Sequence, residues 1–182
     1  MNLTLITGNS GKAEEVRRYL AVPIEHQEID LPEIQSLDLG EIVKDKAERA
    51  FTKLGQPVLV EDVSLVFHAL GQLPGPLIKW FLKELDMEGL CRLVDGKNRR
   101  CTATVCYGLH DGGKVRLFSG SMEGLVSDIP RGSNSFGWAP IFVPLSVHLT
   151  YAELSNEQQA IISMRRKALK KLRDYLVGSH LI

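Results

Sequence analysis

The sequence lacks the features that mark disulfide-rich, zinc-binding and membrane-spanning proteins. Its three cysteines, Cys91, Cys101 and Cys106, are odd in number and form no CxxC pair, which argues against a disulfide framework and a zinc site. No apolar run approaches the roughly 18 residues of a membrane span. The opening MNLTLITGNSGK has no signal-peptide pattern. We therefore expect a cytoplasmic protein without a membrane partner.

The chain also lacks an excess of charge of either sign. Lysine and arginine together number 22, and so do aspartate and glutamate, which makes the net charge zero. A general nucleic-acid binder carries a basic excess, so we expect no nucleic-acid partner. With 44% hydrophobic and 24% charged residues, the composition is that of a folded globular protein. The length of 182 residues allows one domain, residues 1–182, with a sizeable core.

The order of the predicted elements indicates an α/β protein. Apolar runs predict strands at 2–6, 22–31, 57–62, 100–109 and 115–127. Helical spacing predicts helices at 12–20, 38–54, 78–85, 87–94 and 155–177. Strand–helix units at the front, a long hairpin in the middle and a terminal helix together predict a mixed sheet.

A loop with two glycines follows the first strand. Thr7-Gly8-Asn9-Ser10-Gly11-Lys12 leads directly into a helix. A helix N-terminus presents unpaired amides and a partial positive charge, and glycines let a phosphate approach the backbone. Lys12 adds a full charge, although the segment lacks the spacing of a Walker A loop. The local pattern leaves two interpretations open, a phosphate-binding loop or an ordinary helix-capping turn.

Two adjacent carboxylates, Glu61 and Asp62, end a short apolar strand. Ligands in open α/β sheets bind outside the carboxyl ends of strands, and carboxylates at such a place can hold Mg²⁺. Glu33, after the turn at Pro32, is a candidate partner. Helix capping is the alternative role for carboxylates at this position.

The remaining patterns are less specific. Phe136-Gly137-Trp138 places two aromatic rings around a glycine, an arrangement that stacks on a purine ring or packs in a core. Six cations lie from Arg165 to Arg173, and all except Arg165 favour a solvated helix face that opposes the helix dipole. The five histidines are scattered and show no metal-binding spacing.

Several segments, taken together and in order, resemble the inosine triphosphate pyrophosphatase family. They are TGNSGKAEEV (7–16), IDLPEIQ (29–35), PVLVEDVSLVFHALGQLPGPLIKWFL (57–82), FGWAPIF (136–142) and YAELSNEQQAIISMRRKAL (151–169). The resemblance implies an α/β fold with a long mixed β-sheet, helical lobes on both sides and a central substrate cleft. It also implies a homodimer that hydrolyses non-standard purine nucleoside triphosphates, such as inosine and xanthosine triphosphate. The reaction would depend on Mg²⁺ and yield the monophosphate and pyrophosphate.

The resemblance further implies roles for individual residues. Glu33 and Asp62 would ligate Mg²⁺, and Asp62 would also orient or deprotonate the attacking water. Lys46, Lys79 and Arg165 would contact the substrate, whereas Phe136, Gly137 and Trp138 would pack on the base. The phosphates would be cradled by the loop, with Lys12 as a catalytic residue; the loop residues are Thr7, Gly8, Asn9, Ser10, Gly11 and Lys12.

Four positions depart from the pattern of this family. Ala139 stands where the family loop FGWDP has an aspartate, and Met164 stands where the family has a histidine before the arginine. Gln159 replaces a lysine, and Val63 replaces a threonine. The family places these positions around the base, the sugar or their support, so they imply a shifted base selectivity or weakened catalysis. The alternatives to an enzyme are a nucleotide-binding module without turnover and, less favoured, nucleic-acid binding through the basic terminal helix.

Overall fold

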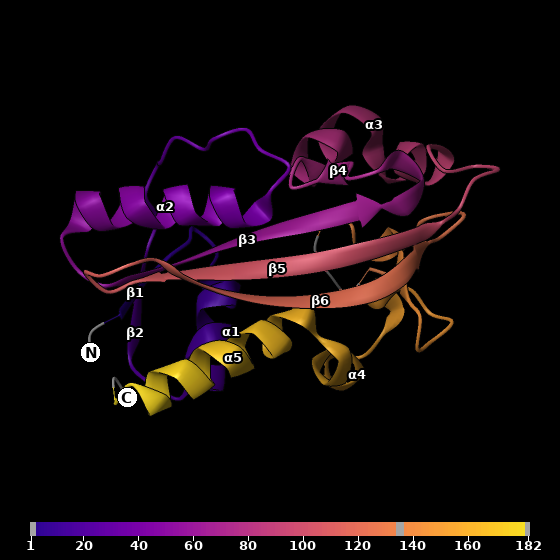
Figure 1. Ribbon diagram of the computed structural model, residues 1–182. Coiled ribbons are helices and arrows are strands. Elements are labelled where there is room, and N and C mark those ends of the chain that lie inside the picture. The colour runs from indigo at the N-terminus through magenta and orange to yellow at the C-terminus, as the bar shows by residue number, and fades with distance from the viewer. Residues whose placement is uncertain (1–2, 134–136, 181–182) are drawn as a thin grey trace. The chain divides into compact units, whose positions relative to one another are not determined.

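The computed structural model describes residues 3–133 and 137–180, which form an α/β structure with a mixed, seven-stranded open sheet (Figure 1). The strand order is β2-β1-β3-β5-β6-β7, and β4 pairs with β3. The chain divides into two compact units. The first contains residues 1–62, 105–120 and 165–182, and the second contains residues 63–104 and 121–164. The strands β3, β5 and β6 each contribute residues to both units, and each unit is described by itself below.

The first unit is built on parallel strands. Strand β1 (Leu3–Ile6) pairs with β2 (Ile24–Gln27) on one side and with β3 (Val58–Phe67) on the other. Helix α1 (Ser10–Leu20) connects β1 to β2, and helix α2 (Leu39–Leu54) leads from β2 to β3. The two helices lie on opposite faces of these strands (Figure 1). The carboxyl end of β1 is therefore a topological switch point, where ligands bind in open α/β sheets.

Helix α2 forms where the sequence predicts it, and both of its ends are capped. The Asp38 carboxylate accepts hydrogen bonds from the amides of Gly40 and Glu41, and Gly55 closes the helix in the left-handed conformation with φ 65°. Asp38 and Glu41 do not form a full capping box, because the backbone amide of Asp38 donates to the Ser36 hydroxyl. The Ser36 hydroxyl in turn donates to the carboxylate of Glu41.

The core beneath α2 is made by one helix stripe and two strands. Val43, Ala47 and Ala50 of α2 are fully buried, and they form one cluster with Ile6, Val58, Val60 and Cys106. These positions follow the helical and alternating periods seen in the sequence. Packing of this cluster fixes α2 against β3. It therefore also fixes the positions of the α2 and β3 side chains that lie outside the core.

The second unit contains β4 (Pro74–Gly75), α3 (Ile78–Arg92), β7 (Phe142–Pro144), α4 (Asn156–Ile162) and parts of β5 (Arg100–His110) and β6 (Arg116–Val126). It also holds short 3-10 helices, of which η2 spans Ala139–Ile141 and η3 spans Tyr151–Glu153. The two short helices predicted around Asp86 are confirmed, because Asp86 takes φ 55° and ψ −171° and breaks α3 there. In the part of the chain that the structure describes, no helix has the length and apolar character needed to cross a membrane.

Three predictions are wrong in their boundaries, and the first is the strand predicted at 22–31, which is only the four residues of β2. The terminal helix is two helices, α4 and α5 (Met164–Gly178), which are separated by Ser163 with ψ 122°. No glycine or proline lies at this break, and the helical spacing continues across it, so the sequence predicts one helix. The third strand does not end at Asp62 but continues to Phe67. Glu61 and Asp62 interrupt an apolar run without ending the strand, because each carboxylate has a cation beside it.

Candidate active site

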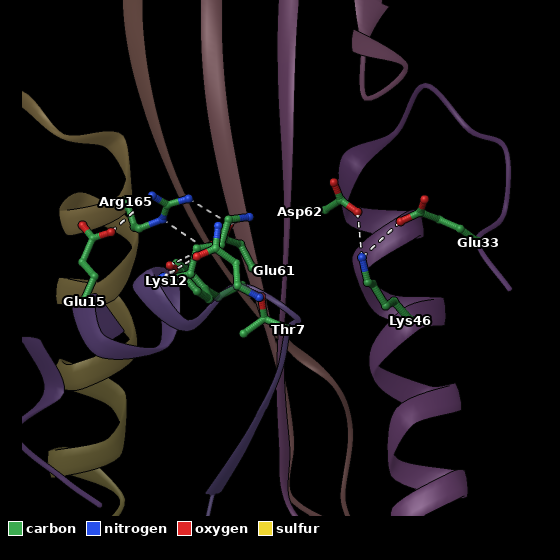
Figure 2. Close-up of polar contacts among 10 residues, drawn as sticks. Thr7, Lys12, Glu15, Glu33, Lys46, Glu61, Asp62 and Arg165 are labelled. Atoms are coloured by element: carbon green, nitrogen blue, oxygen red, sulfur yellow. Dashed lines mark hydrogen bonds and ion pairs between the residues drawn. The ribbon is translucent and has the colours of Figure 1, made fainter. Parts of the chain in front are cut away.

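Two polar clusters of the first unit flank β3 at Glu61 and Asp62 (Figure 2). Successive side chains of a strand point to opposite faces of the sheet. Glu61 points to Lys12 and Arg165, on the face with α1 and α5, whereas Asp62 points to Lys46 of α2 (Figure 2). Both clusters adjoin the carboxyl end of β1, because β1 ends at Ile6 while the parallel β3 continues beyond its partner residue Leu59.

Glu61 is the centre of the first cluster. Its side chain is only 6% exposed, and Lys12 Nζ lies 2.9 Å from its Oε1. Arg165 donates to both carboxylate oxygens, over 3.0 and 2.9 Å, and also to Glu15 over 3.2 Å. Burial alone would raise the pKa of Glu61, but the charges of Arg165 and Lys12 outweigh it and lower the pKa from 4.5 to about 2. Glu61 is therefore ionised in the folded protein at neutral pH.

Tyr107 and Glu15 complete this cluster, and sequence reasoning missed both. The Tyr107 hydroxyl donates to Glu61 over 2.6 Å from the neighbouring strand β5. Burial and the charge of Glu61 together raise the pKa of Tyr107 well above its usual value, so it stays a donor. Tyr107 reads in the sequence as one more apolar strand residue. Glu15 lies three residues after Lys12 on α1, a spacing that places both on one helix face, which was the available signal.

Lys46 is the centre of the second cluster. Its ammonium lies 3.1 Å from Glu33 and 3.1 Å from Asp62, so one cation joins the two carboxylates predicted to ligate Mg²⁺. Burial lowers the pKa of Lys46, but the charges of Asp62 and Glu33 exceed that effect and raise it overall. The structure thus brings Glu33, Lys46 and Asp62 together from a loop, a helix and a strand (Figure 2).

The donor set of Glu33 and Asp62 fits Mg²⁺. Within residues 3–133 and 137–180, no group of three His, Cys, Asp or Glu side chains could hold a metal ion by itself. Mg²⁺ does not need such a cage, because it usually binds one or two carboxylates and completes its shell with water and substrate phosphates. Glu33 and Asp62 both direct oxygens at one shared cation, the Lys46 ammonium, so they could supply the one or two carboxylates that this ion takes from a protein.

The glycine loop is ordered by its own side chains. The Asn9 amide donates to the Thr7 hydroxyl over 3.0 Å, and the Asn9 side chain accepts from the Lys12 amide over 3.1 Å, which caps α1. The amides of Ser10 and Gly11 belong to the first turn, which a helix cannot pair internally. At Gly8, a Cβ atom would lie 2.7 Å from the carboxylate of the exposed Glu28, so a larger residue there would require the Glu28 side chain to move. The loop therefore combines a capped helix start with first-turn amides suited to an anion.

The other predicted substrate residues belong to the second unit, and their place in the site stays a prediction. Ala139 and Met164 are buried there, at 0% and 3% exposure. The side-chain amide of Gln159 donates to the backbone carbonyls of Tyr151 and Leu154. Gly137 lines a pocket of about 480 Å³ with residues of α3. Phe136 lies outside the described residues. The rest of this group are Val63, Lys79 and Trp138.

A parallel-strand switch point with a capped loop, three cations and facing carboxylates defines a candidate site for a phosphorylated ligand. The model of the Ham1 family matches residues 3–175, so the chain belongs to the Ham1 family. It is 43% identical over 180 residues to the inosine triphosphate pyrophosphatase of Emericella nidulans, with 96% of each chain covered. It is also 43% identical over 178 residues to inosine triphosphate pyrophosphatase 2 of Trypanosoma cruzi, covering 95% of this chain and 91% of the relative.

A solved structure agrees with the fold. The HAM1 protein of Coxiella burnetii superposes with a TM-score of 0.88 at 25% sequence identity, covering 98% of this chain and 99% of that one. The α/β fold expected from the resemblance is thereby confirmed.

The lowered pKa of Glu61 makes an acid-sensitive contribution to stability. A carboxyl whose pKa falls on folding stabilises the fold above its unfolded pKa, and this stabilisation is lost as the pH drops toward the folded value. The shift in the pKa of Glu61 from 4.5 to about 2 corresponds to a contribution on the order of 3 kcal/mol to the free energy of unfolding at neutral pH. We expect Glu61→Gln to be less stable than the wild type at pH 7, and this gap to narrow as the pH falls from 5 toward 2. Urea denaturation at several pH values measures it.

Glu48→Gln is the matched control, because Glu48 is exposed and lies 3.9 Å from Lys44 on the surface of α2. Its free energy of unfolding should stay within roughly 1 kcal/mol of the wild type at pH 7. A gap between Glu61→Gln and the wild type that does not change with pH would contradict the role given to the Glu61 charge.

Proposed function

We propose that this chain is a nucleoside triphosphate pyrophosphatase that hydrolyses non-standard purine nucleoside triphosphates to the monophosphate and pyrophosphate. The observation that carries the proposal is the set of charged groups at the end of β1. Lys12 follows the glycine loop, and Lys46 holds Glu33 and Asp62. Phosphoryl substitution needs positioned cations and oriented water more than covalent chemistry. The names of the Emericella and Trypanosoma relatives support this substrate class.

The glycine loop, Lys12, Glu33 and Asp62 each have a part in the proposed reaction. The loop amides and Lys12 bind the phosphates and neutralise their charge. Glu33 and Asp62 hold Mg²⁺, which when bound supplies positive charge at the phosphate oxygens. Asp62 also orients the attacking water or accepts its proton. The water oxygen forms a bond to the α-phosphorus. The bond from the α-phosphorus to the oxygen that bridges to the β-phosphate breaks, and pyrophosphate leaves with that oxygen.

Two properties of the protein as a whole accompany this function. We propose a homodimer, as the resemblance implies, and the large apolar side chains Leu125, Ile129 and Leu145 support it, because each is more than a third exposed. The cytoplasm is the proposed location, and the three cysteines support a reducing compartment, since all are free and buried. A molar mass of one chain by light scattering at micromolar concentration would contradict the dimer. Residence of the tagged chain in an oxidising compartment would contradict the location.

Pyrophosphate release with Mg²⁺ separates the enzyme from a nucleotide-binding module. We expect turnover of inosine or xanthosine triphosphate by the wild type. Asp62→Asn should lower the turnover by about 10²-fold or more, because it removes a metal ligand and the group that handles the water.

Asp45→Asn on α2 is the control, since the Asp45 carboxylate pairs with Arg49 instead of Lys46. It should leave turnover within about twofold of the wild type. Full activity of Asp62→Asn would reject the assignment of Asp62. Nucleotide binding without turnover in the wild type would favour the module.

The selectivity for the base is the finer part of the proposal, and it depends on Met164 and Ala139. Methionine offers a weak sulfur acceptor and no donor in place of the family histidine. Loss of one donor should reduce the preference for a base that presents an oxygen there by about 5- to 150-fold, or roughly 1–3 kcal/mol. We therefore expect weaker discrimination of inosine over adenine triphosphate than in relatives with the histidine and aspartate.

The double variant Met164→His with Ala139→Asp tests this expectation. The measured quantity is the ratio of kcat/KM for inosine and adenine triphosphates, and we expect it to rise toward inosine. Because both positions are buried, a thermal melt must first show that the variant is folded. An unchanged ratio in the folded variant would mean that backbone groups carry base recognition and that Met164 only packs on the ring.

A further inference from the structure

The Lys46 ammonium occupies the point toward which Glu33 and Asp62 direct their oxygens. The two carboxylates come from a loop and from β3, and Lys46 Nζ lies 3.1 Å from each (Figure 2). The Lys46 side chain is 24% exposed, and that of Asp62 is 21% exposed. Bringing two carboxylates to one point is opposed by their mutual repulsion. A cation at that point offsets the repulsion between Glu33 and Asp62.

A divalent ion that binds the same two carboxylates would need this space. Mg²⁺ lies about 2.0–2.1 Å from its oxygen ligands, whereas the ammonium lies 3.1 Å from the same carboxylates. The two cations would then be neighbours of like charge in a partly buried place, where solvent screening is weak. Lys46 has a flexible four-carbon stem that can carry its ammonium elsewhere. The metal ion and the Lys46 ammonium cannot both contact Glu33 and Asp62 at the same time.

We propose that Lys46 is a positioning residue that acts as a substitute cation: it holds Glu33 and Asp62 together until a divalent ion displaces it, and its ammonium then turns to a phosphate of the substrate. This inference rests on the proposed function, because it takes Glu33 and Asp62 as the metal ligands. Binding of the metal and release of the lysine are one exchange, so the cation for the phosphates becomes available only when the metal is in place.

The exchange has a consequence that a purely structural lysine would not have. A structural lysine holds the two ligands in place, so its removal lets them separate and weakens metal binding. A lysine that the metal displaces gives up its two contacts when the metal binds, and the metal then holds the carboxylates together in its place, so removal of the lysine strengthens metal binding. The two roles predict opposite signs for the same variant, in a measurement that needs no turnover.

The test is calorimetric titration of the full chain with Mn²⁺, without nucleotide and at low ionic strength. We expect Lys46→Met to bind Mn²⁺ about tenfold more tightly than the wild type. Lys44→Met is the matched control, because Lys44 lies two residues earlier on α2, is 61% exposed and is 3.9 Å from Glu48. It makes the same change in net charge and should shift the affinity by less than about twofold. Thermal melts establish that both variants are folded.

Asp62→Asn separates failure of this inference from failure of the proposed metal site. Loss of Mn²⁺ binding in Asp62→Asn, with tighter binding in Lys46→Met alone, supports the exchange. Loss of binding in Asp62→Asn with unchanged or weaker binding in Lys46→Met overturns the exchange and leaves the metal site standing. An equal gain in Lys44→Met also overturns it, since the gain then reflects net charge. Unchanged binding in Asp62→Asn overturns the metal site and the exchange together.

Discussion

The buried carboxylate of Glu61 is the constraint on which the first unit depends. A charge that is 6% exposed is tolerated only when it is paired and hydrogen-bonded. The partners come from distant parts of the chain. Lys12 lies in the first turn of α1, Tyr107 lies on β5, and Arg165 lies at the start of α5, 104 residues after Glu61. One carboxylate thereby fixes the start of two helices against the sheet. The glycine loop is held in place because Lys12 belongs to this network.

The alternation of side chains along β3 distributes charge to the two faces of the strand. Glu61 serves the α1 and α5 face, while Asp62, one residue later, serves the α2 face. The strand order β2-β1-β3 puts α1 and α2 on those opposite faces and leaves the carboxyl end of β1 between them. A chain with zero net charge can thus concentrate cations locally, provided that each is matched by a carboxylate in the absence of substrate.

Elements with local signals were predictable, and elements that depend on remote partners were not. Helix α2 carries its own caps, Asp38 and Gly55, and it lies where its helical spacing predicts it. The break at Ser163 has no local marker, and it turned two helices into one in the prediction. The end of β3 was placed at Asp62 because carboxylates normally leave a strand. The structure keeps them inside it, since cations from three helices reach them.

The sequence by itself determined the α/β class, the glycine loop and the candidacy of Lys12, Glu33 and Asp62, because short motifs and carboxylates next to an apolar run are local properties of the chain. Only the tertiary structure decided that Glu61, and not Asp62, holds Lys12 and Arg165, and that Lys46 joins Glu33 to Asp62. Tyr107 and Glu15 entered the site only through folding. The physical reason is that the pairing of buried charges depends on which strand face and which helix end come into contact. The spacing of residues along the chain does not show which of them will do so.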